Sequence, residues 1–230
     1  MNILSLLKEN EYISGEEISR LTGVSRAAVW KSINKLKQQG YEIEAVTNKG
    51  YCLVSRPDIL SSENIKPDTS FIGKSIFYSP VLESTNKIAK QMGHDGAKDG
   101  SVFICDKQTN GKGRMGKVWE TDNDALSMSV LLRPDIIPSK VIPITLIAGL
   151  AVTEAIDNIY NINTKLKWPN DVILNNKKIC GILTEMSAET DLINFLVVGI
   201  GVNVNSQNFA PELSDKATSL LIETGQYKKR

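Results

Sequence analysis

The chain has 230 residues, of which 41% are hydrophobic and 23% are charged, a composition that excludes collagen-like, disordered and low-complexity proteins. This length is sufficient for two modest domains, each with its own core. The formal net charge is +1, so an argument for nucleic-acid binding must rest on where the charges lie and not on their sum.

The cysteines and the apolar segments indicate a reducing compartment. Cys52, Cys105 and Cys180 are odd in number and widely spaced, which is typical of free buried thiols and not of a disulfide or zinc framework. The N-terminus lacks the basic stretch of a signal peptide, and no later apolar run is expected to reach transmembrane length. We therefore predict a cytoplasmic protein without membrane association. The single His94 falls in a predicted surface loop and is given no role, and no metal site is predicted.

The first sixty residues carry the pattern of a helix-turn-helix. Apolar residues at 3–7 predict a first helix, and a serine followed by two acids favours the start of a second. The second ends at Thr22-Gly23-Val24, after which Ser25 can cap a third helix with apolar residues at helical spacing. Two strand-like runs, 41–46 and 51–54, flank a turn and predict a hairpin wing after these helices.

The third helix is the basic element of this region. Between Ser25 and Gln39 every charged residue is a lysine or arginine, whereas the preceding helix contains Glu16 and Glu17. Such a helix can lie in the DNA major groove, with its first side chains near base edges and its lysines near phosphates. Winged helices also serve as protein-interaction modules, so a solvated basic face is the alternative. The predicted DNA-contacting residues are Ser25, Arg26, Ala27, Lys31, Lys35 and Lys49.

A second domain is predicted to follow. Ser55-Arg56-Pro57-Asp58 breaks the strand pattern, and we expect the boundary near residue 63, which gives domains 1–63 and 64–230. Two helices are predicted in this domain, at 84–92 and 142–160. Strand-like runs outnumber these helices and do not alternate regularly with them. The predicted fold class is therefore α+β: a winged helix-turn-helix, then a mixed, mostly antiparallel sheet with helices on one side. The predicted strands are 75–78, 101–105, 126–132, 172–174, 179–185 and 195–202.

The segment 108–119, Gln-Thr-Asn-Gly-Lys-Gly-Arg-Met-Gly-Lys-Val-Trp, is the densest chemical signal in the chain. Gly111, Gly113 and Gly116 satisfy the dinucleotide-binding pattern, but no helix is predicted after them. The segment also satisfies most of the P-loop pattern, but Val118 stands where a serine or threonine must ligate magnesium. What remains is a flexible loop of glycines and cations that can close over a bound anion, with a solvated basic turn as the alternative.

A second motif, Lys167-Trp168-Pro169-Asn170-Asp171, leads into a strand. Pro169 favours an extended conformation at Trp168 and places the next two polar residues at a turn. The chain then turns back, so that Lys178 opens a strand beside Lys167.

Together these motifs resemble the family of bifunctional biotin–protein ligases and biotin operon repressors, whose catalytic domain is class II synthetase-like. Their order and spacing match the family pattern along nearly the whole chain, including the winged helix. The motifs that carry the resemblance are Gly111-Lys112-Gly113-Arg114 with Trp119, Lys167-Trp168-Pro169-Asn170-Asp171, Lys178-Ile179-Cys180-Gly181-Ile182-Leu183 and Gly199-Ile200-Gly201-Val202-Asn203.

The resemblance implies two reaction steps. Biotin and ATP give biotinyl-5′-AMP, and a lysine of the biotin carboxyl carrier protein of acetyl-CoA carboxylase then takes the biotinyl group. The first step joins two anions, so the site must neutralise charge and align the reactants, with Mg²⁺ on the phosphates. The implied catalytic residues are Lys112, Arg114 and Lys178. The implied biotin-binding residues are Ser84, Thr85, Asn86, Gln108, Lys112, Gly113, Arg114 and Lys178, and those for ATP or the adenylate are Trp119, Lys167, Asn170, Lys178 and Asn203.

Three points stay open at this stage. A plain helix cap is the alternative for Ser84. Family members usually continue into a small β-barrel domain, which we do not find before the chain ends at Arg230, so a DNA-binding biotin sensor without ligase turnover is an alternative function. A ligase for lipoate or another acyl group is a second alternative, although such enzymes usually lack a winged helix. Repression from a two-fold operator further implies a homodimer with biotinyl-AMP bound.

Overall fold

A computed structural model describes residues 2–62, 64–190 and 192–230, and these form two compact units, Met1–Ile59 and Leu60–Arg230. The boundary expected near residue 63 falls on a residue outside the described ones. Each unit has its own buried core, and each is described by itself.

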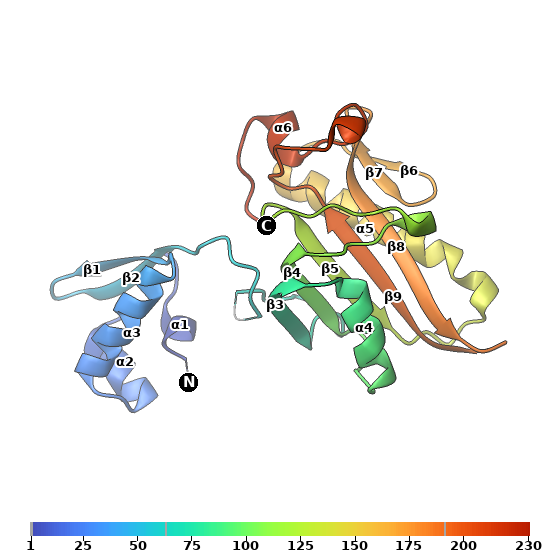
Figure 1. The fold of residues 1–230 in the computed structure, drawn as a ribbon. Helices are drawn as coiled ribbons and strands as arrows, with labels where there is room; N and C mark the ends of the chain where they lie inside the picture. Colours follow the sequence, from blue (N-terminus) through green and yellow to red (C-terminus); the bar gives the residue numbers. More distant parts are fainter. Residues whose placement is uncertain (1, 63, 191) are drawn as a thin grey trace. The chain divides into compact units, whose positions relative to one another are not determined.

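The first unit is a helix-turn-helix followed by a hairpin (Figure 1). The side chains of Ser14 and Ser25 accept hydrogen bonds from the backbone N–H groups of Glu17, at 3.0 Å, and Ala28, at 3.2 Å, and so fix where the second and third helices begin. Gly23 ends the second helix in a left-handed conformation, with φ at 74°. The elements are α1 (Ile3–Leu6), α2 (Gly15–Thr22), α3 (Arg26–Gln38), β1 (Glu42–Val46) and β2 (Gly50–Ser55).

The hairpin of β1 and β2 packs closely against the loop before α2. The two strands are antiparallel, and Gly50 at the start of β2 has φ at 104°. A Cβ on Gly50 would lie 2.1 Å from the carbonyl oxygen of Ile13, so only glycine fits there. The hairpin is thus held by backbone contact as well as by the core residues Ile43 and Leu53.

The second unit is built on a mixed sheet of seven strands, in the order β3-β4-β5-β9-β8-β7-β6. Only β3 and β4 pair in parallel, and the other neighbours are antiparallel, as predicted for a mostly antiparallel sheet. The strands are β3 (Ile76–Leu82), β4 (Val102–Gln108), β5 (Leu126–Leu132), β6 (Lys165–Lys167), β7 (Asp171–Leu174), β8 (Lys177–Ala188) and β9 (Ile193–Val202). The helices are α4 (Thr85–His94), α5 (Ile142–Tyr160) and α6 (Leu220–Thr224), with short 3₁₀ turns at Arg114–Gly116, Pro138–Lys140 and Pro211–Leu213.

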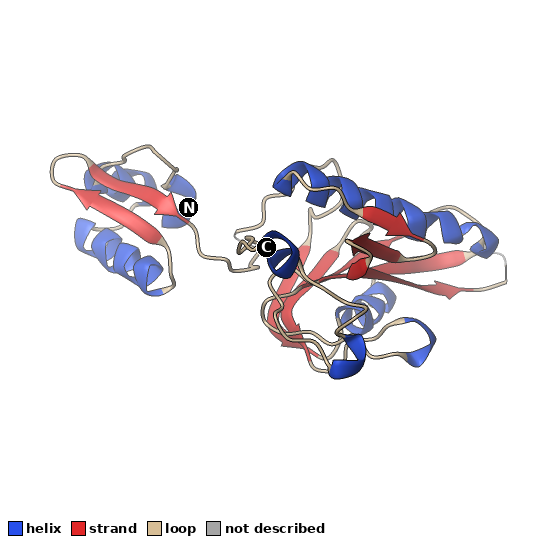
Figure 2. Cartoon of the chain, turned by 90° about the horizontal axis from the view of Figure 1, so that it is seen from above, coloured by secondary structure: helices blue, strands red, loops and turns tan. Residues whose placement is uncertain are grey.

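The two longer helices cover opposite faces of this sheet, as Figure 2 shows from above. Helix α4 packs on a cluster that includes Phe195 and Val197 of β9, whereas α5 packs on one that includes Val198 and Val202. Neighbouring residues of a strand point to opposite faces, so these clusters lie on different sides. The expectation of helices on one side was therefore wrong, because helical periodicity does not say which face of a sheet a helix will cover.

The segment Pro138–Tyr160, which contains α5, has 23 residues and a mean hydropathy of 1.5, enough to cross a membrane by length and composition alone. The expectation that no apolar run reaches this length was wrong for this segment. A single such helix is weak evidence, because the core helix of a soluble protein passes the same test, although only 11% of the apolar window of this helix is buried. Helix α5 does pack on the sheet, through Ala148, Val152 and Ile156, while Ile147 and Leu150 on its outer side are exposed.

Candidate functional site

The start of α4 forms the polar end of a pocket. Ser84, Thr85 and Asn86 are only 3%, 3% and 5% exposed, although all three are polar. The side chain of Ser84 makes no capping hydrogen bond, which argues against the plain helix cap. These residues therefore present hydroxyl, amide and helix N-terminal N–H groups from inside the fold.

A hydrogen-bond network joins this end to the neighbouring strands. Gln108, the last residue of β4, accepts from the backbone N–H of Thr85 at 2.8 Å and from its hydroxyl at 3.2 Å. Ser129 of β5, fully buried, lies 2.8 Å from the Thr85 hydroxyl and donates to Asn86 Oδ1 at 2.6 Å. Buried polar groups with all their partners are held rigidly, so this end of the pocket is formed before any ligand arrives.

Three glycines make the floor. Gly181 of β8 and Gly201 of β9 are paired across the two strands, and the indole of Trp119 lies against both. A Cβ on Gly201 would lie 2.5 Å from this indole, and a Cβ on Gly199 would lie 2.1 Å from Asn86 Oδ1. Glycine is thus required for the close approach of both side chains to the sheet.

The cationic loop folds back on itself beside this floor. Gly113 N–H donates to the carbonyl of Lys117 at 2.7 Å, and Trp119 N–H donates to that of Gly111 at 2.9 Å. The tip is a 3₁₀ turn, Arg114–Gly116, and the next regular element is β5. No helix opens here, so the context that a dinucleotide fold requires is missing.

Two cations from different elements line the pocket, and each is held by a residue of the motif 167–171. Lys178 Nζ lies 2.6 Å from Asp171 Oδ1 and 5.3 Å from the centre of the Trp119 ring. Asp171 Oδ1 is buried and accepts no directed hydrogen bond among the described residues. Its close contact with Lys178 is therefore an ion pair. Arg114 donates to Asn170 Oδ1 at 3.0 Å, and Asn170 is itself anchored by donating to the Ile182 carbonyl at 2.9 Å.

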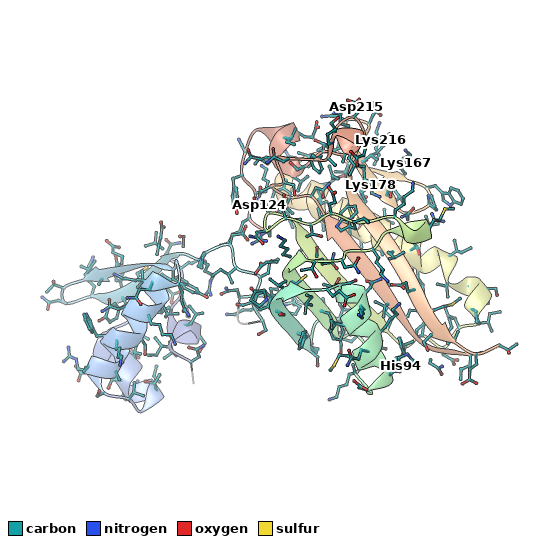
Figure 3. All side chains as sticks on the ribbon, in the orientation of Figure 1. His94, Asp124, Lys167, Lys178, Asp215 and Lys216 are labelled. Carbon is teal, nitrogen blue, oxygen red and sulfur yellow. The ribbon has the colours of Figure 1, made fainter. Side chains whose placement is uncertain are left out.

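These residues line two adjoining cavities. Ten of the predicted site residues line the smaller one, of about 50 Å³, together with the three floor glycines. Lys167 and Asn203 line the larger one, of about 700 Å³, which also includes Arg114, Trp119 and Lys178. Figure 3 shows Lys167, Lys178 and Lys216 gathered at one end of the sheet. The ten residues are Ser84, Thr85, Asn86, Gln108, Lys112, Gly113, Arg114, Trp119, Asn170 and Lys178.

Several residues of the site received no role of their own from sequence analysis. Gly181, Gly199 and Gly201 were part of the family motifs, but their role as a floor depends on strand register. Lys216, which is exposed and lines the larger cavity, comes from a loop, and its carbonyl accepts from Lys178 N–H at 2.8 Å. Ser129 looked like an ordinary strand serine.

Two other features lie away from this site. A groove of about 870 Å³ beside β3 is larger than either cavity, yet it contains none of the predicted site residues, so size alone does not mark the site. His94 is the last residue of α4, not part of a loop as expected, and its ring packs edge-on against Phe195 at 4.9 Å. Figure 3 shows it far from the labelled lysines.

In the first unit, all six predicted DNA-contacting residues are exposed. Ser25, Arg26, Ala27, Lys31 and Lys35 belong to α3 or its cap, and Lys49 belongs to the turn of the hairpin, where its Nζ lies 5.5 Å from the Tyr12 ring. Trp30 of α3 is 61% exposed as well, and sequence reasoning did not single it out. The structure therefore leaves the basic face of α3 open to a partner.

Residues 78–203 match the model of the biotin/lipoate A/B protein ligase family, and residues 1–52 match that of a helix-turn-helix domain. The chain belongs to the biotin/lipoate A/B protein ligase family. It is 45% identical to the bifunctional ligase/repressor BirA of Bacillus subtilis (strain 168) over 94% of this chain and 68% of that protein. It is 30% identical to the BirA of Escherichia coli (strain K12) over 98% of this chain and 70% of that protein.

The fold agrees with that of this family. A biotin protein ligase from Aquifex aeolicus, solved in complex with biotin and ATP, superposes with a TM-score of 0.61 at 34% identity and covers 68% of this chain. The chain spans 64% of the length of that structure. The resemblance inferred from the motifs and the α+β class are confirmed, and the chain is homologous to bifunctional ligase/repressors in both of its units.

Proposed function

We propose that this chain is a biotin–[acetyl-CoA-carboxylase] ligase and a biotin-dependent repressor. The observation that carries the proposal is the smaller cavity, where a buried polar end meets Lys112, Arg114 and Lys178 over a floor without side chains. Such a pocket suits a neutral polar ring whose carboxylate lies among cations. The relatives named bifunctional ligase/repressor and the solved ligase with biotin and ATP support this choice of ligands.

In the first step, a biotin carboxylate oxygen attacks the α-phosphorus of ATP, and the bond to pyrophosphate breaks. Lys112 and Arg114, exposed on the loop, are free to close over the two anions, and Lys178 can leave Asp171 for the acyl phosphate. Trp119, Lys167, Asn170 and Asn203 are the proposed adenylate contacts. In the second step, the amine of a carrier-protein lysine attacks the biotinyl carbonyl carbon and AMP leaves.

Mg²⁺ is proposed to enter with ATP. No group of three or more His, Cys, Asp or Glu side chains able to hold a metal occurs among the described residues. Mg²⁺ is commonly bound by substrate phosphates and one or two carboxylates, and Glu120 and Asp122 of the larger cavity can supply these. Bound there, the ion would neutralise charge on the phosphates.

The ligase half is tested by incubating the full chain with biotin, ATP and Mg²⁺ and measuring biotinyl-AMP and pyrophosphate. We expect product, and a loss of roughly 10- to 100-fold in Lys178→Met, because a charge-assisted contact is worth about 1.5–3 kcal/mol. The matched control is Lys177→Met, whose Nζ bonds the Ser214 carbonyl at 3.0 Å outside both cavities. Biotin binding without adenylate would identify a sensor, and adenylation of lipoate in place of biotin would identify a lipoate ligase.

The repressor half is proposed to act through α3 as a homodimer with biotinyl-AMP bound, on operator DNA. Lys31 and Arg26 are exposed and carry the positive charge nearest the start of the helix. The three free, buried cysteines support a reducing, cytoplasmic location. Sedimentation with and without biotin and ATP tests the dimer, and an unchanged sedimentation coefficient contradicts it.

The double variant Arg26→Ala, Lys31→Ala tests the DNA-binding surface. With a 40-base-pair duplex of mixed sequence as probe, we expect binding to weaken about tenfold at low salt and the salt slope to fall by about two charges. Lys8→Ala, in the same unit but outside α3, is the control, since Lys8 pairs with Glu11. An unchanged affinity and slope would exclude α3 as the DNA-binding helix.

A further inference from the structure

Asn86 is tied to strand β8 by two hydrogen bonds that use both of its amide hydrogens. Its Nδ2 donates to the Leu183 carbonyl at 3.2 Å and to Glu185 Oε2 at 2.8 Å. The opposite orientation of the amide would place Oδ1 against these two oxygen acceptors, which repel it, so only one orientation of the Asn86 amide is favourable. Asn86 can therefore offer a ligand only its carbonyl oxygen, which accepts from Ser129 and has one lone pair left.

Glu185 is held in turn by a lysine of α4. Lys90 Nζ lies 2.6 Å from Glu185 Oε1, so each carboxylate oxygen has a different partner. Burial raises the pKa of Glu185, but hydrogen bonds from Lys90 and Asn86 and the charge of Lys112 outweigh it, and the net pKa is lowered. Glu185 is thus an ionised acceptor at neutral pH.

We propose that Glu185 is a positioning residue for the ring of the acid substrate: with Lys90 as its anchor, it fixes the Asn86 amide so that the pocket presents a pure hydrogen-bond acceptor to a ring N–H. This inference rests on the proposed function and adds a residue that does not line the cavity. Glu185 and Asn86 are 99 positions apart in the sequence, so the contact depends on α4 lying against β8.

The consequence for binding follows from the two carboxylate oxygens of Glu185, each of which accepts from a different donor. A glutamine at 185 can accept from Lys90 or from Asn86, but its own NH₂ group then faces the other donor. Asn86 would lose its fixed orientation, and a rotated amide would present N–H groups to the ring N–H. Affinity for biotin should fall, while Arg114 and Lys178 of the cationic end keep their partners.

The test is biotin binding to the full chain by calorimetry, together with the KM values for biotin and ATP and kcat in adenylate formation. For Glu185→Gln we expect the Kd and KM for biotin to rise about tenfold, with the KM for ATP and kcat within about twofold. Lys90→Met should give a smaller rise. Lys87→Met is the matched control on the same helix, because the Lys87 side chain is paired with the exposed Glu83 and is not the partner of Asn86 or Glu185.

A charge-reversed double variant, Lys90→Glu with Glu185→Lys, separates positioning from ion-pair stability. It restores an ion pair between α4 and β8 but places an ammonium donor against the Asn86 NH₂ group. We expect its thermal stability to recover relative to the single variants while biotin binding stays weak. Recovered biotin binding would overturn the proposal, as would an unchanged biotin Kd in Glu185→Gln. If the wild-type chain binds no biotin, the proposed function itself fails. If the wild-type chain binds biotin and Glu185→Gln binds it equally well, only the role of Glu185 fails, so the two failures are distinguishable.

Discussion

The two ends of the pocket are built in opposite ways. At the polar end, Thr85, Asn86 and Ser129 are buried and bonded to one another, so their geometry exists without a ligand. At the cationic end, Lys112 and Arg114 are exposed on a loop and held by few contacts. The neutral ring can thus be selected by a rigid surface, whereas the charged intermediate is retained by groups that must move, and the two tasks can be separated by mutation.

Arg114→Gly should have the largest effect, because it removes the guanidinium that can bridge phosphate and carbonyl oxygens. We expect biotinyl-AMP to dissociate about 100-fold faster, equivalent to the loss of a charge-assisted hydrogen bond, and bystander lysines to become biotinylated. Release of labelled adenylate measures this. Met115→Gly, in the same 3₁₀ turn but without a charge, is the control, and equal release from the two variants would refute the assignment.

Gly201→Ala should have the next largest effect, because it disturbs the floor that both ends share. The new Cβ would lie 2.5 Å from Trp119, so the indole must shift. We expect adenylate formation to fall about tenfold. In a Trp119→Ala background the same substitution should cost much less, because its clash is gone, and additive effects in this double-mutant cycle would contradict the mechanism.

Ser129→Ala should act on the polar end with a smaller effect. It removes the buried donor to Asn86 Oδ1, so we expect a loss of about 1–2 kcal/mol in the free energy of unfolding and roughly threefold weaker biotin binding. Ser127→Ala, also buried on β5, is the control, since its hydroxyl is 3.5 Å from Gln108 Nε2, at the limit of a hydrogen bond. Denaturant unfolding and calorimetry measure the two quantities, and equal losses in both variants would mean that the network is not specific.

The cysteines of the sheet test the rigidity of the sheet itself and need no substitution. Burial raises the pKa of Cys105 and of Cys180 from 9.0 to about 12, so almost no thiolate exists at pH 8. We expect neither thiol to react with iodoacetamide in the folded chain, whereas both react in urea. Because the unfolded thiols ionise near pH 9, the free energy of unfolding should fall as the pH rises from 9 toward 12. Rapid labelling at pH 8 would show that the sheet opens.

The sequence predicted the elements better than their contacts. The strand 126–132 and the helix 142–160 have the predicted bounds, because strong apolar periodicity is a local property. The side of the sheet that each helix covers was not predictable, and neither was the pairing of Gly181 with Gly201, since both depend on strand register. The family motifs identified residues of the two cavities, whereas Glu185 contacts Asn86 from 99 positions away and escaped notice.

The fixed amide of Asn86 bears on which acids the enzyme would turn away. A dithiolane such as that of lipoate has no N–H group, so it would leave the carbonyl oxygen of Asn86 buried without a second hydrogen-bond donor. Sites built around such a bond reject analogues that lack it by about 10⁴-fold or more. Discrimination between biotin and lipoate would then depend on the fixed orientation of the Asn86 amide, without any steric barrier.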